Sequence, residues 1–236
     1  MEINWPSIPE IAQRWDALYQ YLSRMYQLET VAVTLVEHQF ELFKVKNIDQ
    51  LLDQAAEQII PSPDDIPYWS ELWPSALALA QYLLREVDLS GQVVIELGCG
   101  LGLAGLAAGK KGGEVTFTDL KEDALRLAEL NWLHNLHTPV VTRILDWRSP
   151  PTGLKVPILI AADVAYEKRL FAPLLHTIDQ LLLPDGILFL SEPNRSVARE
   201  FFQQLQAAGF NTIRHSEPVP GPGGEVKVSV YRVERM

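Results

Sequence analysis

The stretch "VVIELGCGLGLAG", Val93–Gly105, begins as a short apolar strand and then passes through three closely spaced glycines. Gly98, Gly100 and Gly102 allow a tight turn and close approach of a ligand to the backbone, because glycine has no side chain. The apolar residues from Leu103 onward read as the start of a helix. The order of strand, glycine loop and helix predicts a ligand site at the carboxyl end of this strand.

The glycine spacing is compatible with two kinds of cofactor. Gly100, Gly102 and Gly105 satisfy the dinucleotide pattern G-x-G-x-x-G, in which a pyrophosphate lies at the helix N-terminus. The wider pattern E-x-G-x-G-x-G, which starts at Glu96, looks like the first motif of seven-strand methyltransferases. Their cofactor, S-adenosylmethionine, carries an amino-acid group, an adenosine and a sulfonium, but no phosphate. Glu96 either helps to hold the ammonium group of this cofactor or is a hydrogen-bonded carboxylate at a strand end.

Strands and helices alternate through the rest of the chain. Helices are predicted at 75–87, 103–111, 122–136, 171–183 and 196–208, and strands at 92–97, 114–119, 139–146, 156–163, 186–191, 211–218 and 225–233. Apolar strands separated by helices are typical of a mostly parallel sheet with helices on both faces. The last two strands are expected to place an antiparallel element at one edge. The predicted fold class is therefore α/β, with a Rossmann-like sheet of seven strands.

The N-terminal part of the chain follows a different pattern. A helix is predicted at 8–27, a hairpin of two strands at 30–36 and 40–45, and a short helix at 48–59. The prolines and acids of 61–67 are typical of a linker. We therefore expect a small α/β extension over residues 1–60 and a main domain over residues 61–236.

Three further residues follow predicted strands and are candidates for cofactor binding. Asp119 can accept hydrogen bonds from both ribose hydroxyls of a nucleoside, or it can cap the helix that follows. Asp146 can accept a hydrogen bond from an adenine amine, and the indole of Trp147 can cover the adenine ring. The alternatives for these two residues are a turn acid and a tryptophan that anchors the surface.

Several segments, taken in order, resemble a family of seven-strand lysine methyltransferases that act on chaperones, elongation factors and the electron-transfer flavoprotein β-subunit. The matching segments are "PYWSELWPSA", "VIELGCGLGLAGLAA", "VTFTDLKEDALRLAELN", "DW" and "ILIAADVAYEKRLFAPLL", within residues 67–175. The resemblance does not cover residues 1–60. The chain departs from it at "SEPNR", residues 191–195, a region in which the family varies with its substrates, so the methyl acceptor stays open.

This resemblance implies S-adenosylmethionine as the cofactor of a methyltransferase domain. It implies that Trp73 lines the cofactor pocket, that the loop backbone surrounds the methionine portion, and that Ala162 contributes from the end of its strand. Together with the candidates above, the predicted cofactor-binding residues are Trp73, Glu96, Gly98, Cys99, Gly100, Gly102, Asp119, Asp146, Trp147 and Ala162.

By the same resemblance, Asp163 and Tyr166 match a D-x-x-Y motif on the substrate side and are the predicted catalytic residues. Methyl transfer requires alignment of the nucleophile, the methyl group and sulfur, and a lysine amine with a reference pKa of about 10.4 must first lose a proton. Asp163 is expected to orient the ammonium group, and Tyr166 to accept an amine hydrogen bond. The alternatives are a helix-capping acid and a half-buried packing residue.

Composition and charge restrict the classes of partner and the compartment that we expect for the protein. The formal net charge of −10 disfavours non-specific contact with nucleic acid and suits a basic, lysine-bearing protein. The single cysteine, Cys99, excludes a disulfide within the chain, and no secretory signal or membrane-spanning run is visible, so we expect a cytoplasmic protein. The histidines lack metal-ligand spacing, so no metal is expected.

The sequence leaves several functions open. The first is a protein-lysine N-methyltransferase, and the second is a methyltransferase for a small amine or pyridine metabolite. The third is a non-catalytic assembly protein that keeps the fold. A nicotinamide dehydrogenase fits less well, since a second catalytic domain is lacking. The oligomeric state and the number of methyl groups transferred are not determined by the sequence.

Overall fold

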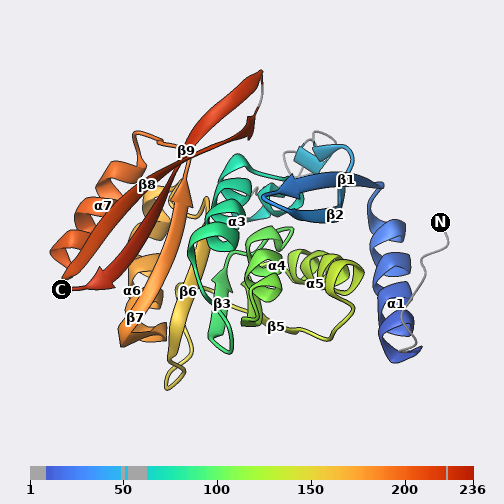
Figure 1. The fold of residues 1–236 in the computed structure, drawn as a ribbon, viewed down its shortest axis with the longest axis horizontal. Coiled ribbons are helices and arrows are strands. Elements are labelled where there is room, and N and C mark those ends of the chain that lie inside the picture. Colours follow the sequence, from blue (N-terminus) through green and yellow to red (C-terminus); the bar gives the residue numbers. More distant parts are fainter. Residues whose placement is uncertain (1–8, 49–50, 53–62, 222) are drawn as a thin grey trace.

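A computed structural model describes residues 9–48, 51–52, 63–221 and 223–236 of the chain. Its main sheet has seven strands in the order β5-β4-β3-β6-β7-β9-β8 (Figure 1). The strands are β3 (Val93–Leu97), β4 (Glu114–Asp119), β5 (Val141–Ile144), β6 (Val156–Ala162), β7 (Leu182–Glu192), β8 (Phe210–Gly221) and β9 (Gly224–Arg235). The predicted number of strands and the mostly parallel α/β arrangement are confirmed.

Alternating side chains of each strand divide the interior into two hydrophobic layers. Val94 packs on one face beneath α3 (Pro74–Glu86), α4 (Leu103–Lys110) and α5 (Glu122–Leu136), and its neighbour Ile95 packs on the other face. This second face is covered by α6 (Phe171–Leu181) and α7 (Ala198–Ala207). The parallel strands β5, β4, β3, β6 and β7 therefore end at one common edge, with helices on both sides.

The boundaries of the sixth helix and the seventh strand differ from the prediction. The predicted helix continued to residue 183, but α6 ends at Leu181 and β7 begins at Leu182. Leu182 pairs with Val156, and a register irregularity follows before Ile187 pairs with Ile158. Pro184 is thus accommodated inside an irregular strand, because pairing with β6 overrides the local helix pattern.

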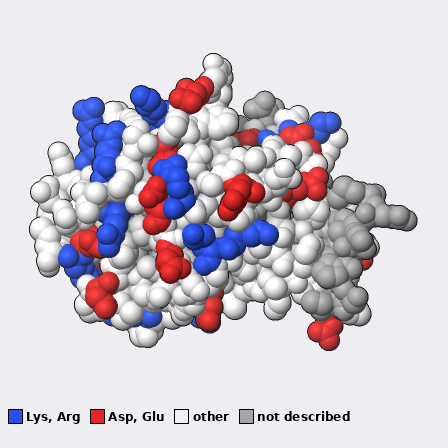
Figure 2. Space-filling model, in the orientation of Figure 1, with Lys and Arg blue, Asp and Glu red and all other residues white. Residues whose placement is uncertain are grey.

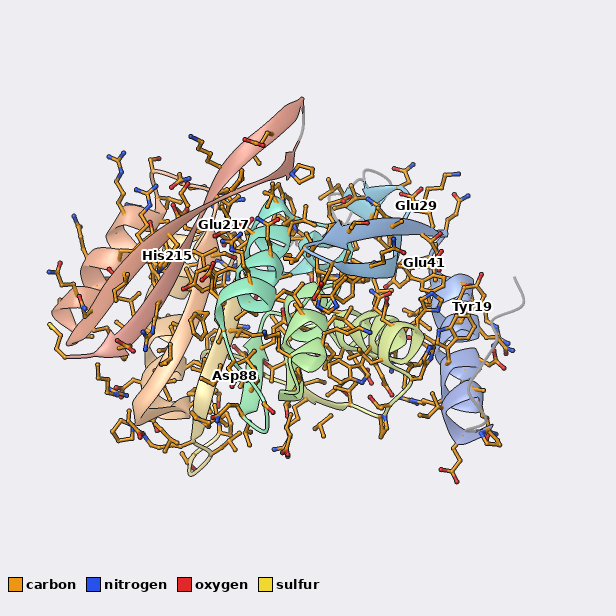
Figure 3. The ribbon with its side chains drawn as sticks, in the orientation of Figure 1. Tyr19, Glu29, Glu41, Asp88, His215 and Glu217 are labelled. Atoms are coloured by element: carbon orange, nitrogen blue, oxygen red, sulfur yellow. The ribbon has the colours of Figure 1, made fainter. Side chains whose placement is uncertain are left out.

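The antiparallel element lies at the predicted edge. β9 pairs antiparallel with β7, and β8 pairs antiparallel with β9 as the outermost strand. Glu217 of β8 is buried against α3, where Arg85 and Gln81 donate to its carboxylate at 2.7 and 2.9 Å (Figure 3). These contacts fix the hairpin to the helix that leads into the sheet.

At the N-terminal end of the chain, α1 (Pro9–Met25) leads into the antiparallel hairpin of β1 (Leu28–Leu35) and β2 (His38–Val45). This confirms the predicted helix and hairpin, whereas most of the predicted helix at 48–59 lies outside the described residues. Trp15, Leu22 and Phe40 belong to the same hydrophobic cluster as α3, α4 and α5. The described N-terminal elements therefore pack on the main domain, and the proposed division at residue 60 stays a prediction.

Two asparagines of α5 hold the free edge of β2. Asn131 accepts the N–H of Phe43 at 2.7 Å and donates to its carbonyl at 3.1 Å. One turn later, Asn135 makes the same pair of bonds with Glu41, at 3.0 and 2.9 Å. Asn131 also donates to the carbonyl of Leu101 in the glycine loop at 3.0 Å. The side-chain amides thus act as a neighbouring strand and join the hairpin to the loop.

Replacement of Asn131 with alanine is expected to lower the free energy of unfolding by about 2–4 kcal/mol, because buried backbone groups of Phe43 and Leu101 lose their partners. Asn135→Ala is the matched control. Asn135 is half-buried, so water can replace its amide and the loss is expected to be about 1 kcal/mol. Urea titration of both variants measures the difference, and equal losses would contradict the special role of Asn131.

Candidate active site

A cavity of about 410 Å³ lies at the carboxyl edge of the parallel strands. It is within the usual size range of small-molecule sites. The predicted site residues that line it are Trp73, Gly98, Cys99, Gly100, Gly102, Asp119, Asp146, Trp147, Ala162, Asp163 and Tyr166. Residues from four separate strand ends therefore meet in one cavity, as the sequence analysis expected. Glu96 is not among the lining residues.

The glycine loop is enclosed on both sides by aromatic segments. Gly98 and Gly100 have φ values of +65° and +49°, which favour glycine. A Cβ atom on Gly98 would lie 3.3 Å from the indole of Trp147, and one on Gly100 would lie 3.1 Å from the carbonyl oxygen of Trp69. A side chain at either position would be crowded and its backbone strained, so glycine is favoured and the backbone itself lines the cavity.

Glu96 lies in β3, and its side chain joins this strand to α4. Its carboxylate is buried and accepts the N–H of Gly105 at 2.8 Å. Burial raises the pKa of Glu96 to about 8, and the nearby charge of Asp119 acts in the same direction. This placement favours the alternative in which Glu96 is a hydrogen-bonded carboxylate at the strand end.

Asp119 at the end of β4 is bound to the loop and to its own turn. Its carboxylate accepts the N–H of Gly100 at 3.2 Å and the N–H of Lys121 at 3.0 Å. Burial raises the pKa of Asp119 above its usual range. A carboxylate has about four lone-pair positions, so the side chain keeps some capacity to accept hydrogen bonds from ligand hydroxyls. Lys121, and not Asp119, occupies the N-cap position of α5, so the capping alternative is not supported and the ribose role of Asp119 stays a prediction.

The part of the cavity that follows β5 carries ion pairs that the sequence did not predict. Arg148 donates to Asp146 at 2.8 Å, which lowers the pKa of Asp146. Asp64 accepts hydrogen bonds from Arg148 at 3.0 Å and from Arg169 at 2.7 Å. The pKa of Asp64 is lowered mainly by its bond to Arg169. The only sequence signal for Asp64 was the acidic linker, since its two partners lie in distant loops.

Aromatic residues of the segment before α3 cover the cavity. The indole N–H of Trp73 donates to the carbonyl of Tyr68 at 2.8 Å. The Tyr68 ring makes edge contacts with Trp73 and with Tyr166, at centroid distances of 6.1 and 5.7 Å. Trp69 makes an edge contact with Tyr26, which follows α1, at a centroid distance of 5.5 Å. Trp73 therefore belongs to the aromatic cover of the cavity, whereas Trp69 also anchors the segment to the N-terminal helix.

Asp163 is fixed by partners from two other elements. It has a left-handed backbone, with φ of +60°, and only 9% of its surface is exposed. Arg195 forms an ion pair with its carboxylate, and the hydroxyl of Ser75 donates to it at 3.2 Å. Glu167, and not Asp163, occupies the N-cap position of the next helical turn, Lys168–Leu170. The capping alternative for Asp163 is therefore not supported.

The cavity matches the chemistry of S-adenosylmethionine. A backbone cradle without side chains can take the methionine portion, and Asp119 offers acceptors for ribose hydroxyls. Trp147 lies against the loop on the adenosine side. When bound, the cofactor supplies an electrophilic methyl group. Among the described residues, no cluster of three or more histidine, cysteine or acidic side chains is placed to hold a metal ion.

The fold and this cavity define an S-adenosylmethionine-dependent methyltransferase of the Rossmann-like class. A family model described as lysine methyltransferase matches residues 68–208, and the chain belongs to this family. The chain is 32% identical to EEF1A lysine methyltransferase 3 of Mus musculus, over 69% of this chain and 71% of that protein. It is 30% identical to protein N-lysine methyltransferase METTL21A of Mus musculus, over 70% and 76%.

The fold is also similar to solved structures of more distant proteins. The ribosomal protein L11 methylase from Lactobacillus delbrueckii subsp. bulgaricus superposes with a TM-score of 0.57 at 18% identity, covering 87% of this chain and 99% of that chain. At this identity the match supports the seven-strand architecture alone.

The titration of Glu96 predicts a pH-dependent stability. The folded-state pKa of about 8 lies above the unfolded value of 4.5, so the folded protein binds one more proton between these values. The free energy of unfolding should therefore fall as pH rises through this window, by up to about 1.4 kcal/mol per pH unit. Glu96→Gln, which keeps the shape but not the charge, should remove this slope. Urea titrations of both proteins at pH 5, 6.5 and 8 measure the free energy of unfolding. If it changes with pH equally in the wild type and in Glu96→Gln, the prediction is wrong.

Trp73→Ala should clearly weaken cofactor binding. It should lower the melting temperature of the ligand-free protein only slightly. The loss of affinity should be about tenfold for S-adenosylmethionine and smaller for S-adenosylhomocysteine, which lacks the sulfonium charge that favours an aromatic neighbour. Calorimetric titration measures both affinities. Trp69→Ala is the control. It should clearly lower the melting temperature and change the affinity for the cofactor only slightly. A Trp73 variant that loses stability but not affinity would show that Trp73 is a packing residue.

Proposed function

We propose that the chain transfers a methyl group to a lysine side chain exposed on a protein, and that it acts in the cytoplasm. The observation that supports this most directly is the position of Asp163 and Tyr166, which line the same cavity as the glycine loop. The family membership supports lysine as the acceptor. The single cysteine in the sequence supports a reducing compartment.

The two predicted catalytic residues offer hydrogen bonds to an amine. Arg195 and Ser75 use three of the roughly four lone-pair positions of the Asp163 carboxylate. The remaining position on Oδ1 can accept one N–H of the acceptor. Burial raises the pKa of Tyr166 to about 12, so its hydroxyl stays protonated at neutral pH. We infer that Tyr166 orients the amine by hydrogen bonding and does not act as a phenolate base.

Surface charge supports a protein acceptor rather than a nucleic acid. On the face shown in Figure 2, basic and acidic side chains are interspersed and do not form a continuous basic stripe. The net charge of −10 acts against a phosphate backbone. Within the part of the chain that the structure describes, no helix is long and apolar enough to cross a membrane.

The acceptor class is tested with labelled S-adenosylmethionine and a lysate of source cells that lack the protein. We expect a labelled protein band whose acid hydrolysate contains methylated lysine. Methylated histidine or arginine in the hydrolysate would overturn the lysine assignment. Label confined to small molecules would overturn the protein acceptor and support a metabolite methyltransferase instead.

Tyr166→Phe should lower kcat for the labelled protein by at least about tenfold, because the hydroxyl that orients the amine is lost. The affinity for S-adenosylhomocysteine should change less than about threefold, since the ring remains in place. Single-turnover kinetics and calorimetry measure the two quantities. An unchanged kcat would show that the hydroxyl takes no part in the reaction.

A further inference from the structure

Arg195 presents a positive charge to the cavity beside the predicted catalytic acid. The side chain of Arg195 is 34% exposed, whereas that of its partner Asp163 is 7% exposed. Two nitrogens of the guanidinium contact the two oxygens of Asp163. A guanidinium has five N–H donors, and among the described residues Asp163 is its only acceptor. Arg195 therefore lines the cavity together with Asp163 and keeps N–H donors that Asp163 does not use.

The turn that carries Arg195 is fixed in place. Glu192, which is buried at the end of β7, accepts the backbone N–H groups of Asn194 and Arg195 at 2.8 and 2.9 Å. The side-chain oxygen of Asn194 accepts bonds from Arg214 and Ser229, both at 2.7 Å. The position of the guanidinium is therefore set by β7, β8 and β9 and does not depend on a bound ligand.

The charge of Arg195 is unfavourable for most groups that this cavity receives. The sulfonium and the α-ammonium of S-adenosylmethionine are cations, and a protonated lysine acceptor is a third. The α-carboxylate of the cofactor is the only anionic group among the reactants. Apart from its protein partner Asp163, the guanidinium of Arg195 therefore finds a complementary charge only in that carboxylate.

The other cations of the cavity lie at its opposite end. Lys121 follows β4 and binds Asp65 at 2.9 Å. Arg148 follows β5 and binds Asp64 and Asp146. In the sheet, β4 and β5 lie on one side of β3, and β7, which leads to Arg195, lies on the other. The ribose and adenine positions are on the β4 and β5 side, so the amino-acid tail extends toward Arg195.

We propose that Arg195 binds the α-carboxylate of S-adenosylmethionine and that Asp163 holds the guanidinium in the orientation for this contact. Arg195 is then a cofactor-binding residue in the segment where the chain departs from the family pattern. The proposal rests on the cofactor and not on the identity of the methyl acceptor, so it can fail or succeed independently of the lysine assignment.

The test compares two ligands by calorimetry: S-adenosylhomocysteine and its decarboxylated analogue, which keeps the adenosine, the sulfur and the amine. The wild-type protein should bind S-adenosylhomocysteine about 10- to 100-fold more tightly than the analogue, since a charge-assisted contact is lost. Arg195→Gln should reduce this preference to less than about threefold by weakening only the carboxylate ligand. Arg195→Lys, which keeps the charge without the planar fork, should give an intermediate preference.

Arg199→Gln is the matched control, because Arg199 is exposed on α7 and does not line the cavity. The Arg199→Gln protein should prefer S-adenosylhomocysteine over the decarboxylated analogue by the same factor as the wild type. Equal affinities of the wild type for the two ligands would overturn the proposal without any variant. An Arg195→Gln protein that keeps the full preference, or that loses both ligands equally, would also overturn it. Melting temperatures verify that each variant is folded. If Arg195→Gln is not folded, the comparison of the two ligands is made with Arg195→Lys.

Discussion

The glycine loop between β3 and α4 has little room for a side chain at Gly98 or Gly100, and the other parts of the cavity are placed against it. Trp147 approaches it from the β5 side, and the carbonyl of Trp69 approaches it from the segment before α3. Asp119 accepts the amide of Gly100, which ties the end of β4 to the same loop. A side chain at Gly98 or Gly100 would separate these layers. The cavity therefore depends on close backbone packing more than on any single polar contact.

The N-terminal elements contribute to the same region through α5. Asn131 links Phe43 of the hairpin to Leu101 of the glycine loop, so the two are held by one buried amide. Trp69 in turn contacts Tyr26 at the end of α1. The described N-terminal residues are thus connected to the cofactor loop by direct contacts. Buried polar networks of this kind stabilise one arrangement when all their members are bonded.

Two acidic side chains of the cavity form ion pairs with arginines from distant parts of the chain. Asp64 is bound by arginines that follow β5 and β6, and Asp163 is bound by Arg195, which follows β7. Each acid therefore has its charge compensated before a ligand enters. This pairing leaves hydrogen-bonding capacity at Asp163 but reduces its pull on a cationic acceptor. Orientation of the amine, and not long-range attraction, is the role that this geometry supports.

The sequence by itself determined the succession of strands and helices along the chain, the position of the glycine loop and most of the residues at strand ends. These follow from periodicity and from the rule that parallel strands end at one edge. The tertiary structure decided how those residues are used. It bonded the Glu96 side chain to α4 outside the cavity lining, started β7 immediately after α6, and brought Arg195 to Asp163. These outcomes depend on burial and on pairing between distant segments, which local sequence patterns do not encode.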